Sequence, residues 1–188
     1  MPYNALDTSQ AAADGSLAAA PPTPVIAFSY TGDYRIDTLL DGLQYRWNSA
    51  APLGSPVTVT YSFMTAKPVY GGTDSGGDTG FRPFSTQQQQ ATREVFARLG
   101  SELGISFREV SDGASQYGQI RLGNNTQQSS AGYAYLPNST GDDKAGDVWL
   151  DDSTPANLTQ LAQGSYAWAT LLHEIGHALG LKHPFEGT

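Results

Sequence analysis

The sequence predicts an α/β or α+β domain in which a C-terminal helix packs on a twisted sheet. The chain has 188 residues, 39% of them hydrophobic and 11% aromatic, which is enough for one domain with a buried core. Segments with helical spacing of apolar residues alternate with short segments rich in β-branched and aromatic residues. Their order is helix, strand, helix, several strands and helix, which is typical of a layered fold.

Two regions differ in composition. Residues 1–32 are assigned to a flexible leader or a prosegment remnant, because residues 11–24 are rich in Ala and Pro and show little periodic apolar content. The folded unit is expected to occupy residues 33–188.

The first elements are predicted from local pattern. Apolar residues recur at helical spacing over 33–43, and Tyr45 and Trp47 follow as candidate core residues. Residues 57–63 alternate β-branched and aromatic side chains and predict a strand. Residues 70–80 are rich in glycine and predict a loop.

A second helix is predicted to begin after Ser85, a suitable N-cap residue with Gln88 three positions later. It is expected to end at Gly104. Its buried stripe is predicted to contain Val95, Phe96, Leu99 and Leu103.

Short strands are expected in the next region, each bounded by Gly, Asn, Asp or Pro. They are predicted over 105–110, 119–122, 133–136 and 147–150. Aromatic residues on these strands, Tyr135 and Trp149, are interpreted as core more readily than as subsite residues. The nearby acidic residues lack the spacing of a helix-loop-helix calcium site and are interpreted as solvated loop charges: Asp142, Asp143, Asp147, Asp151 and Asp152.

The last helix is predicted to begin at about Ser165. Its core-facing stripe is predicted to contain Tyr166, Ala169, Leu172, Ile175 and Leu179. The chain has three histidines, and all of them lie in or just after this helix, in the pattern H-E-x-x-H-x-x-G-x-x-H.

The histidine spacing predicts a metal site. His173 and His177 are four residues apart, about 40° in rotation and about 6 Å in rise on a helix, so both imidazoles can meet one ion. His183 can join them only if the helix ends and the chain folds back, and Gly180 lies where that reversal has to occur. Three neutral nitrogen ligands suit zinc and leave a fourth position open. The short H-E-x-x-H pattern alone also occurs on helices with surface histidines, but the longer pattern is far more specific.

Glu174 follows the first of these histidines and is predicted to be a general base. Its carboxylate can reach a zinc-activated water from the side and take the proton as the water attacks a polarised carbonyl. The expected reaction is hydrolysis of a peptide bond.

Composition restricts the partners. The chain has 18 acidic and 10 basic residues, a formal net charge of −8, which argues against general nucleic-acid or anionic-membrane binding. Cysteine is absent, so disulfides and thiolate ligands are excluded. The sequence has neither an 18-residue apolar run nor a conventional signal peptide. Proteins or peptides are therefore the expected partners.

The chain resembles the catalytic domain of the serralysin family, secreted bacterial metzincin proteases. The zinc motif lies within residues 170–184, and three further stretches are similar to the family: 77–80 leading to Phe84 and Ser85, 134–137, and 146–149. The resemblance implies a mixed five-stranded sheet with one antiparallel edge strand and zinc at the bottom of a cleft. It also implies secretion through a C-terminal type I signal.

One departure from the family follows the third histidine. Serralysins continue into a Met-containing turn, a tyrosine near zinc, and a calcium-binding repeat domain, whereas this chain ends at Thr188. The chain is therefore expected to be a fragment whose C-terminal piece is a further partner, with Ca²⁺ confined to that piece. Phe185 to Gly187 also differ from the family. The alternative function is an inactive fragment or binding module that keeps the fold.

Residues 132–137 are the candidate substrate-pairing strand, because proteases of this type hold an extended peptide at an open sheet edge. The alternative is an ordinary edge strand protected by Pro137. The predicted substrate-binding residues are Gly132, Tyr133, Ala134, Tyr135 and Leu136.

Overall fold

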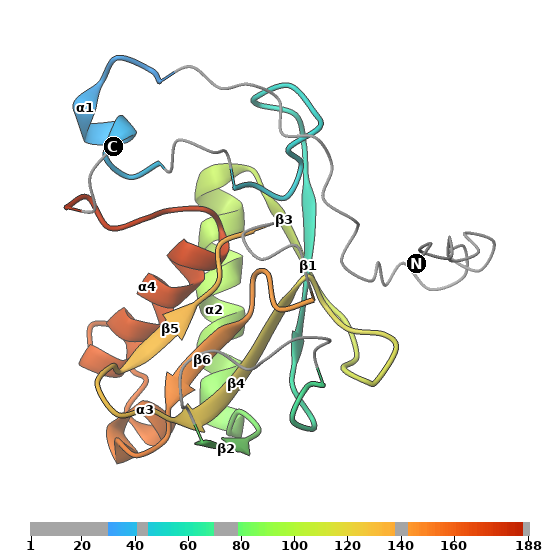
Figure 1. Cartoon of the computed structure of the whole chain (residues 1–188), viewed down its shortest axis with the longest axis vertical. Coiled ribbons are helices and arrows are strands. Elements are labelled where there is room, and N and C mark those ends of the chain that lie inside the picture. The colour runs from blue at the N-terminus through green and yellow to red at the C-terminus, as the bar shows by residue number, and fades with distance from the viewer. Residues whose placement is uncertain (1–29, 41–44, 70–78, 138–142, 186–188) are drawn as a thin grey trace, which may run out of the picture.

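The computed structural model describes residues 30–40, 45–69, 79–137 and 143–185. Helices α2 (Thr86–Leu103) and α4 (Tyr166–Ala178) lie on one face of a twisted mixed sheet (Figure 1). Two further helices are short and do not belong to this pair: α1 (Tyr34–Asp37) and α3 (Pro155–Thr159). The predicted leader, apart from its last three residues, and most of the predicted 70–80 loop lie outside the described residues. None of the described helices is long and apolar enough to cross a membrane.

The sheet has the order β3-β1-β4-β6-β5, and β2 pairs with β4 beside this path. Three neighbouring pairs are parallel, whereas the edge strand β5 is antiparallel to β6. The expected five-stranded mixed sheet with an antiparallel edge is thus confirmed, and β2 is an addition to it. The strands are β1 (Thr58–Phe63), β2 (Thr79–Arg82), β3 (Ser106–Glu109), β4 (Ile120–Thr126), β5 (Gly132–Ala134) and β6 (Val148–Asp151).

The predicted start and end of α2 are confirmed. The Ser85 hydroxyl accepts a hydrogen bond from the Gln88 backbone N–H, and the Gln88 side chain accepts one from the Ser85 N–H. Gly104 ends the helix in the left-handed conformation, with a φ of 68°. Phe96 is buried against the sheet, but Leu103 is 56% exposed, so its predicted burial is wrong. Leu103 lies at the end of α2, where it lines a cavity together with Leu99 and Leu179.

The predicted helix over 33–43 is much shorter in the structure. Asp33 caps α1, which ends after one turn, and the chain then forms a β-bridge between Leu40 and Leu181. The Lys182 N–H donates to the Leu39 carbonyl, which continues this pairing. Tertiary pairing with the C-terminal region therefore takes precedence over local helical spacing. Residues 41–44 lie outside the described set.

The start of α4 was predicted correctly, because the Ser165 hydroxyl accepts from the Trp168 N–H. Its core-facing stripe was predicted only in part. Ile175 is fully buried, and Leu172 and Leu179 pack partly buried against the core, but Tyr166 is 73% exposed and Ala169 is exposed as well. The other buried apolar residues of the helix are Ala167, Leu171 and Ala178. Because residues 166–172 are almost all apolar, their pattern did not determine which side faces the sheet.

Of the five aspartates interpreted as solvated, Asp142 lies outside the described residues, and Asp147 and Asp151 are buried. Asp151 accepts hydrogen bonds from Gln127, Ser153 and Thr154. Asp147 has no exposed surface, and neither carboxylate oxygen has a hydrogen-bond partner among the described residues. Burial raises the pKa of Asp147 well above its usual value of 3.8. Asp147 directly precedes β6, all four residues of which are buried, and it is enclosed with the start of that strand.

Replacing Asp147 by Asn is expected to stabilise the protein at neutral and alkaline pH. Below the usual pKa of 3.8 the carboxyl is protonated in both states, and as the pH rises the unfolded state ionises first, so wild-type stability is lost. We expect Asp147→Asn to melt higher at pH 8 by about 2–4 °C, equivalent to ~1 kcal/mol. The gain should disappear below about pH 4. A melting-temperature difference that does not change with pH would contradict this account.

Candidate metal centre and active site

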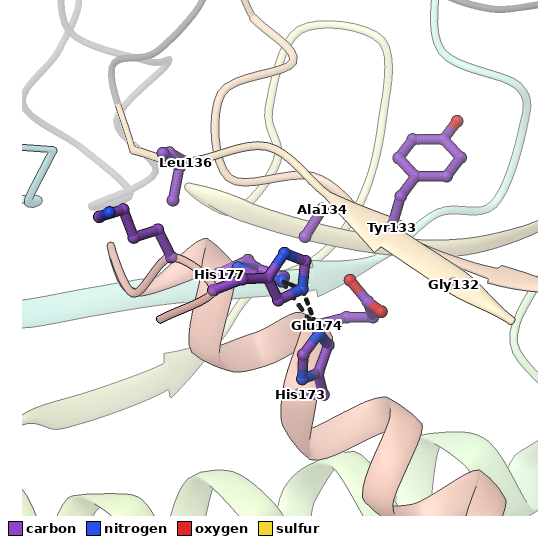
Figure 2. A pocket seen from close by; sticks show the side chains of 9 residues that line it. Gly132, Tyr133, Ala134, Leu136, His173, Glu174 and His177 are labelled. Atoms are coloured by element: carbon purple, nitrogen blue, oxygen red, sulfur yellow. Dashed lines mark hydrogen bonds between the residues drawn. The ribbon is translucent and has the colours of Figure 1, made fainter. Parts of the chain in front are cut away.

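Three imidazoles converge at the end of α4 (Figure 2). The Nε2 atom of His173 lies 3.0 Å from that of His177 and 3.0 Å from that of His183, and the third distance is 3.1 Å. These three residues are a group able to hold a metal ion among the described residues. The structure therefore brings together all the ligands expected from the sequence.

The third imidazole reaches the other two because the helix ends in a tight reversal. The Gly180 N–H donates to the His177 carbonyl, and the Leu181 N–H donates to the Gly176 carbonyl. These two bonds form a Schellman motif, which needs a left-handed residue after the helix. Gly180 supplies it with a φ of 104°. A side chain there would also collide with the Tyr45 carbonyl oxygen, because a Cβ atom would lie only 2.1 Å from it.

The nitrogen spacing fits zinc. Tetrahedral zinc at about 2.0–2.1 Å from each imidazole sets neighbouring nitrogens about 3.3–3.4 Å apart. The observed separations of 3.0–3.1 Å are close to that value. Neutral imidazoles are also common zinc ligands, and a three-histidine set is one of those found at catalytic sites.

Hydrogen bonding and burial favour neutral ligands. The His177 Nδ1 atom lies 2.6 Å from the Leu181 carbonyl oxygen. A carbonyl only accepts, so Nδ1 carries the proton and Nε2 is left with its lone pair. Burial lowers the pKa of His173, and the nearby His177 and His183 lower it further. His173 is therefore held in the form that binds a metal.

Glu174 lies beside the three histidines but faces the sheet. Figure 2 shows its carboxylate below β5, close to Gly132. The side chain is 5% exposed, and burial raises the pKa of Glu174 to about 7, an effect that His183 opposes. A dication held by the histidines would favour the ionised carboxylate. In that ionised form the carboxylate can accept a proton, as a general base requires.

The edge strand β5 lies over this centre. Hydrogen bonds from the Asp151 N–H to the Ala131 carbonyl and from the Tyr135 N–H to the Asp147 carbonyl show which backbone groups face β6. Because these groups alternate in an antiparallel pair, those of Gly132 and Ala134 point to the outer edge. No described strand pairs with that edge.

Of the predicted substrate-binding residues, four line a cavity of about 330 Å³ together with the histidines: Gly132, Tyr133, Ala134 and Leu136. The ring of Tyr133 points away from the imidazoles (Figure 2) and its hydroxyl accepts from the Asn125 amide. Tyr135 stacks edge-on against Tyr133 and does not line this cavity. The two tyrosine rings therefore support the strand from its other face.

Sequence reasoning missed a support for the metal-binding turn, here termed the N-terminal strap: Leu39, Leu40, Tyr45 and Trp47. The Trp47 indole N–H donates to the Ala178 carbonyl at 3.0 Å, and the Leu39 carbonyl accepts from the Lys182 N–H. Trp47 could be identified as a core residue from its size, but its partner lies 131 residues away and no local pattern indicates it.

Phe185 was also missed. Its ring stacks nearly parallel on that of His183, at 5.1 Å and 6°. The rings of His183 and His173 are also stacked, with centroids 5.0 Å apart. The third imidazole thus contacts two rings, although Phe185 itself is 80% exposed.

Comparison with known proteins agrees with this geometry. A family model described as Matrixin, in the peptidase family M10, matches residues 82–187, more than half of the chain. The chain belongs to the matrixin peptidases. The match covers α2, the sheet strands from β3 to β6 and the histidine motif. The metzincin fold expected from the sequence is therefore confirmed.

The curated relatives of this matrixin include bacterial serralysins. A serralysin from Proteus mirabilis is 34% identical over 73% of the chain, and the metallopeptidase AprA of Pseudomonas marginalis is 32% identical over 83%. The resemblance to serralysins drawn from sequence motifs is thereby confirmed. The chain spans only 30% and 32% of the lengths of these two relatives.

Among solved structures, myroilysin aligns with 74% of this matrixin and 52% of its own chain. The sequence identity is 24% and the TM-score is 0.38, and these values are too low to support a conclusion about fold or function.

Replacing any one of the three histidines by Ala is expected to weaken zinc binding by more than about 100-fold, beyond the usual effect of changing an outer partner of a ligand. Elemental analysis after dialysis against a zinc buffer measures the loss. Tyr166→Ala, an exposed substitution on the same helix, serves as the control and should keep one zinc per chain. Full zinc retention in all three histidine variants would rule out this ligand set.

Trp47→Phe is expected to weaken zinc binding roughly three- to tenfold, the effect of one lost hydrogen bond. The substitution keeps an aromatic ring but removes the donor that holds the Ala178 carbonyl. Competition with a chromophoric chelator gives the affinity. Trp168→Phe on α4 is the matched control, and equal affinities for the two variants would show that the N-terminal strap does not support the turn.

Proposed function

We propose that this matrixin is a secreted zinc-dependent endopeptidase that hydrolyses peptide bonds of extracellular proteins. The observation that carries the proposal is the convergence of three Nε2 atoms within 3.1 Å of one another beside the buried carboxylate of Glu174. The names of its relatives, serralysin and metallopeptidase, support the same chemistry.

His173, His177 and His183 would hold the zinc, and their Nε2 atoms are the donors. Zinc bound at such a site acts as a Lewis acid that polarises a carbonyl and acidifies water. The Leu181 carbonyl orients the ring of His177 by accepting from its Nδ1–H. Stacking contacts with Phe185 and His173 restrict the rotation of the His183 ring.

Glu174 is proposed as the general base. One of its carboxylate oxygens accepts a proton from the attacking water while the water oxygen bonds to the peptide carbonyl carbon. The same carboxyl then gives the proton to the leaving nitrogen as the C–N bond breaks. Burial raises the pKa of Glu174, whereas bound zinc would favour the ionised form that accepts the proton.

The peptide is proposed to bind along the outer edge of β5. The backbone groups of Gly132 and Ala134 point toward that edge, so an extended segment can add to the sheet there. Small residues at these two positions let the peptide lie close to the carboxylate and the imidazoles. The long side chain of Tyr133 on β5 and that of Tyr135, just after the strand, pack against each other on the opposite face.

Protein and peptide substrates are the proposed partners, and extracellular action is proposed from the likeness to serralysins. Export through a type I system and a calcium-binding continuation belong to the same proposal. Sequencing the gene beyond Thr188 and detecting the product in culture medium would test both. A product retained in the cell would contradict the proposed secretion. It would not affect the proposed hydrolysis of peptide bonds, which the assay below tests.

Glu174→Gln is expected to keep zinc and lower the rate of casein hydrolysis by about 10²–10⁴-fold, the usual effect of removing a general base. The amide has nearly the same shape but cannot take a proton at neutral pH. Glu94→Gln, an exposed position on α2, is the matched control and should have wild-type activity.

The assay compares the full gene product with the 188-residue chain. Wild-type activity in Glu174→Gln would remove Glu174 from the mechanism. Zinc binding without any peptidase activity in the wild-type gene product would favour the binding-module alternative.

A further inference from the structure

The carboxylate of Glu174 has no hydrogen-bond partner in the described part of the chain. The side chain is only 5% exposed, yet it makes no hydrogen bond or ion pair with any residue that the structure describes. A carboxylate in catalysis has to be held close to one position, because a displacement of about 1 Å can lower a rate by about 100-fold. Packing therefore has to determine where this carboxylate lies.

Gly132 forms the closest wall of that packing. A Cβ atom added to Gly132 would lie 2.9 Å from Glu174 Cγ and 3.1 Å from Glu174 Oε1. It would also lie 3.1 Å from Leu150 Cδ2 on β6, so a second side chain crowds the same position. Figure 2 shows the carboxylate directly below this part of β5.

The backbone does not require glycine at this position. Gly132 is in a regular strand, paired with Leu150, and its φ is not in the left-handed region. Glycine within a strand weakens it and often marks the close approach of another group. Here the approaching group is the Glu174 side chain.

We propose that Gly132 is a positioning residue for Glu174, so that β5 both pairs with the peptide and fixes the place of the general base. This inference rests on the proposed function. The outward backbone groups of Gly132 would meet the substrate, while its Cα atom faces the carboxylate. One strand would thus set the distance between the bond to be cleaved and the group that moves the proton.

Gly132→Ala tests the proposal. The Glu174 side chain is flexible, so the added methyl group is expected to displace the carboxylate rather than unfold the strand. We expect kcat to fall about 10- to 100-fold, with KM changed less than about threefold and zinc content unchanged. Gly113→Ala is the matched control, because a Cβ there meets only the Gln116 carbonyl oxygen, at 3.6 Å.

A second substitution distinguishes positioning from damage to the peptide-binding edge. If Gly132 acts through the carboxylate, Gly132→Ala should have little further effect on kcat when Glu174 is already Gln. If it acts on peptide binding, the two effects should multiply and KM should rise. Multiplying effects would overturn the proposal.

A crystal structure of metal-free Gly132→Ala gives a readout that does not depend on activity. We expect the Glu174 carboxylate to move by about 1 Å or more while β5 keeps its register with β6. An unmoved carboxylate would overturn the positioning role even if the wild-type protein had no peptidase activity. Absence of wild-type activity together with a displaced carboxylate would instead refute the proposed function and leave the steric role of Gly132 in place.

Discussion

The chain reversal after α4 is the constraint on which the candidate centre depends. A straight helix presents His173 and His177 together but directs a residue six positions later to another side. Gly180 ends the helix with a φ of 104°, and the two Schellman hydrogen bonds fix the path that returns His183 to the same point. The Tyr45 carbonyl lies against this glycine, so the N-terminal strap leaves no room for a side chain. Ligand geometry thus follows from one backbone conformation.

The histidine site was predictable because it is local. The spacing of the ligands and the position of Gly180 depend only on helical geometry, and all fall within eleven residues. The capping box at Ser85 is local too. Which side of α4 faces the sheet was harder to predict. Residues 166–172 are apolar on every side, so only contact with the sheet decides which of them are buried. For α1, pairing of Leu40 with Leu181 shortened a helix that spacing alone would continue.

Features that involve distant parts of the chain could not be predicted. The burial of Asp147 depends on the strands around β6, whereas in sequence it looks like its solvated neighbour Asp143. Gly132 was identified with the substrate strand, but its contact with Glu174 joins residues 42 positions apart and has no sequence pattern. The edge strand, the carboxylate and the imidazoles meet only when β5 is placed over α4. A motif therefore indicates which groups take part, and the sheet determines how they face one another.

The strap also bears on the order in which the molecule assembles. Trp47 and Ala178 are 131 residues apart, and the bond between them closes a loop that contains all six described strands of the sheet. Contacts of such long range form late, because the entropy of closing the loop has to be overcome first. His173 and His177 can be brought together by a single nascent helix, but His183 depends on the turn that the strap supports. Binding of the ion at full affinity would then require complete folding. Tight zinc binding would therefore indicate that the domain has folded.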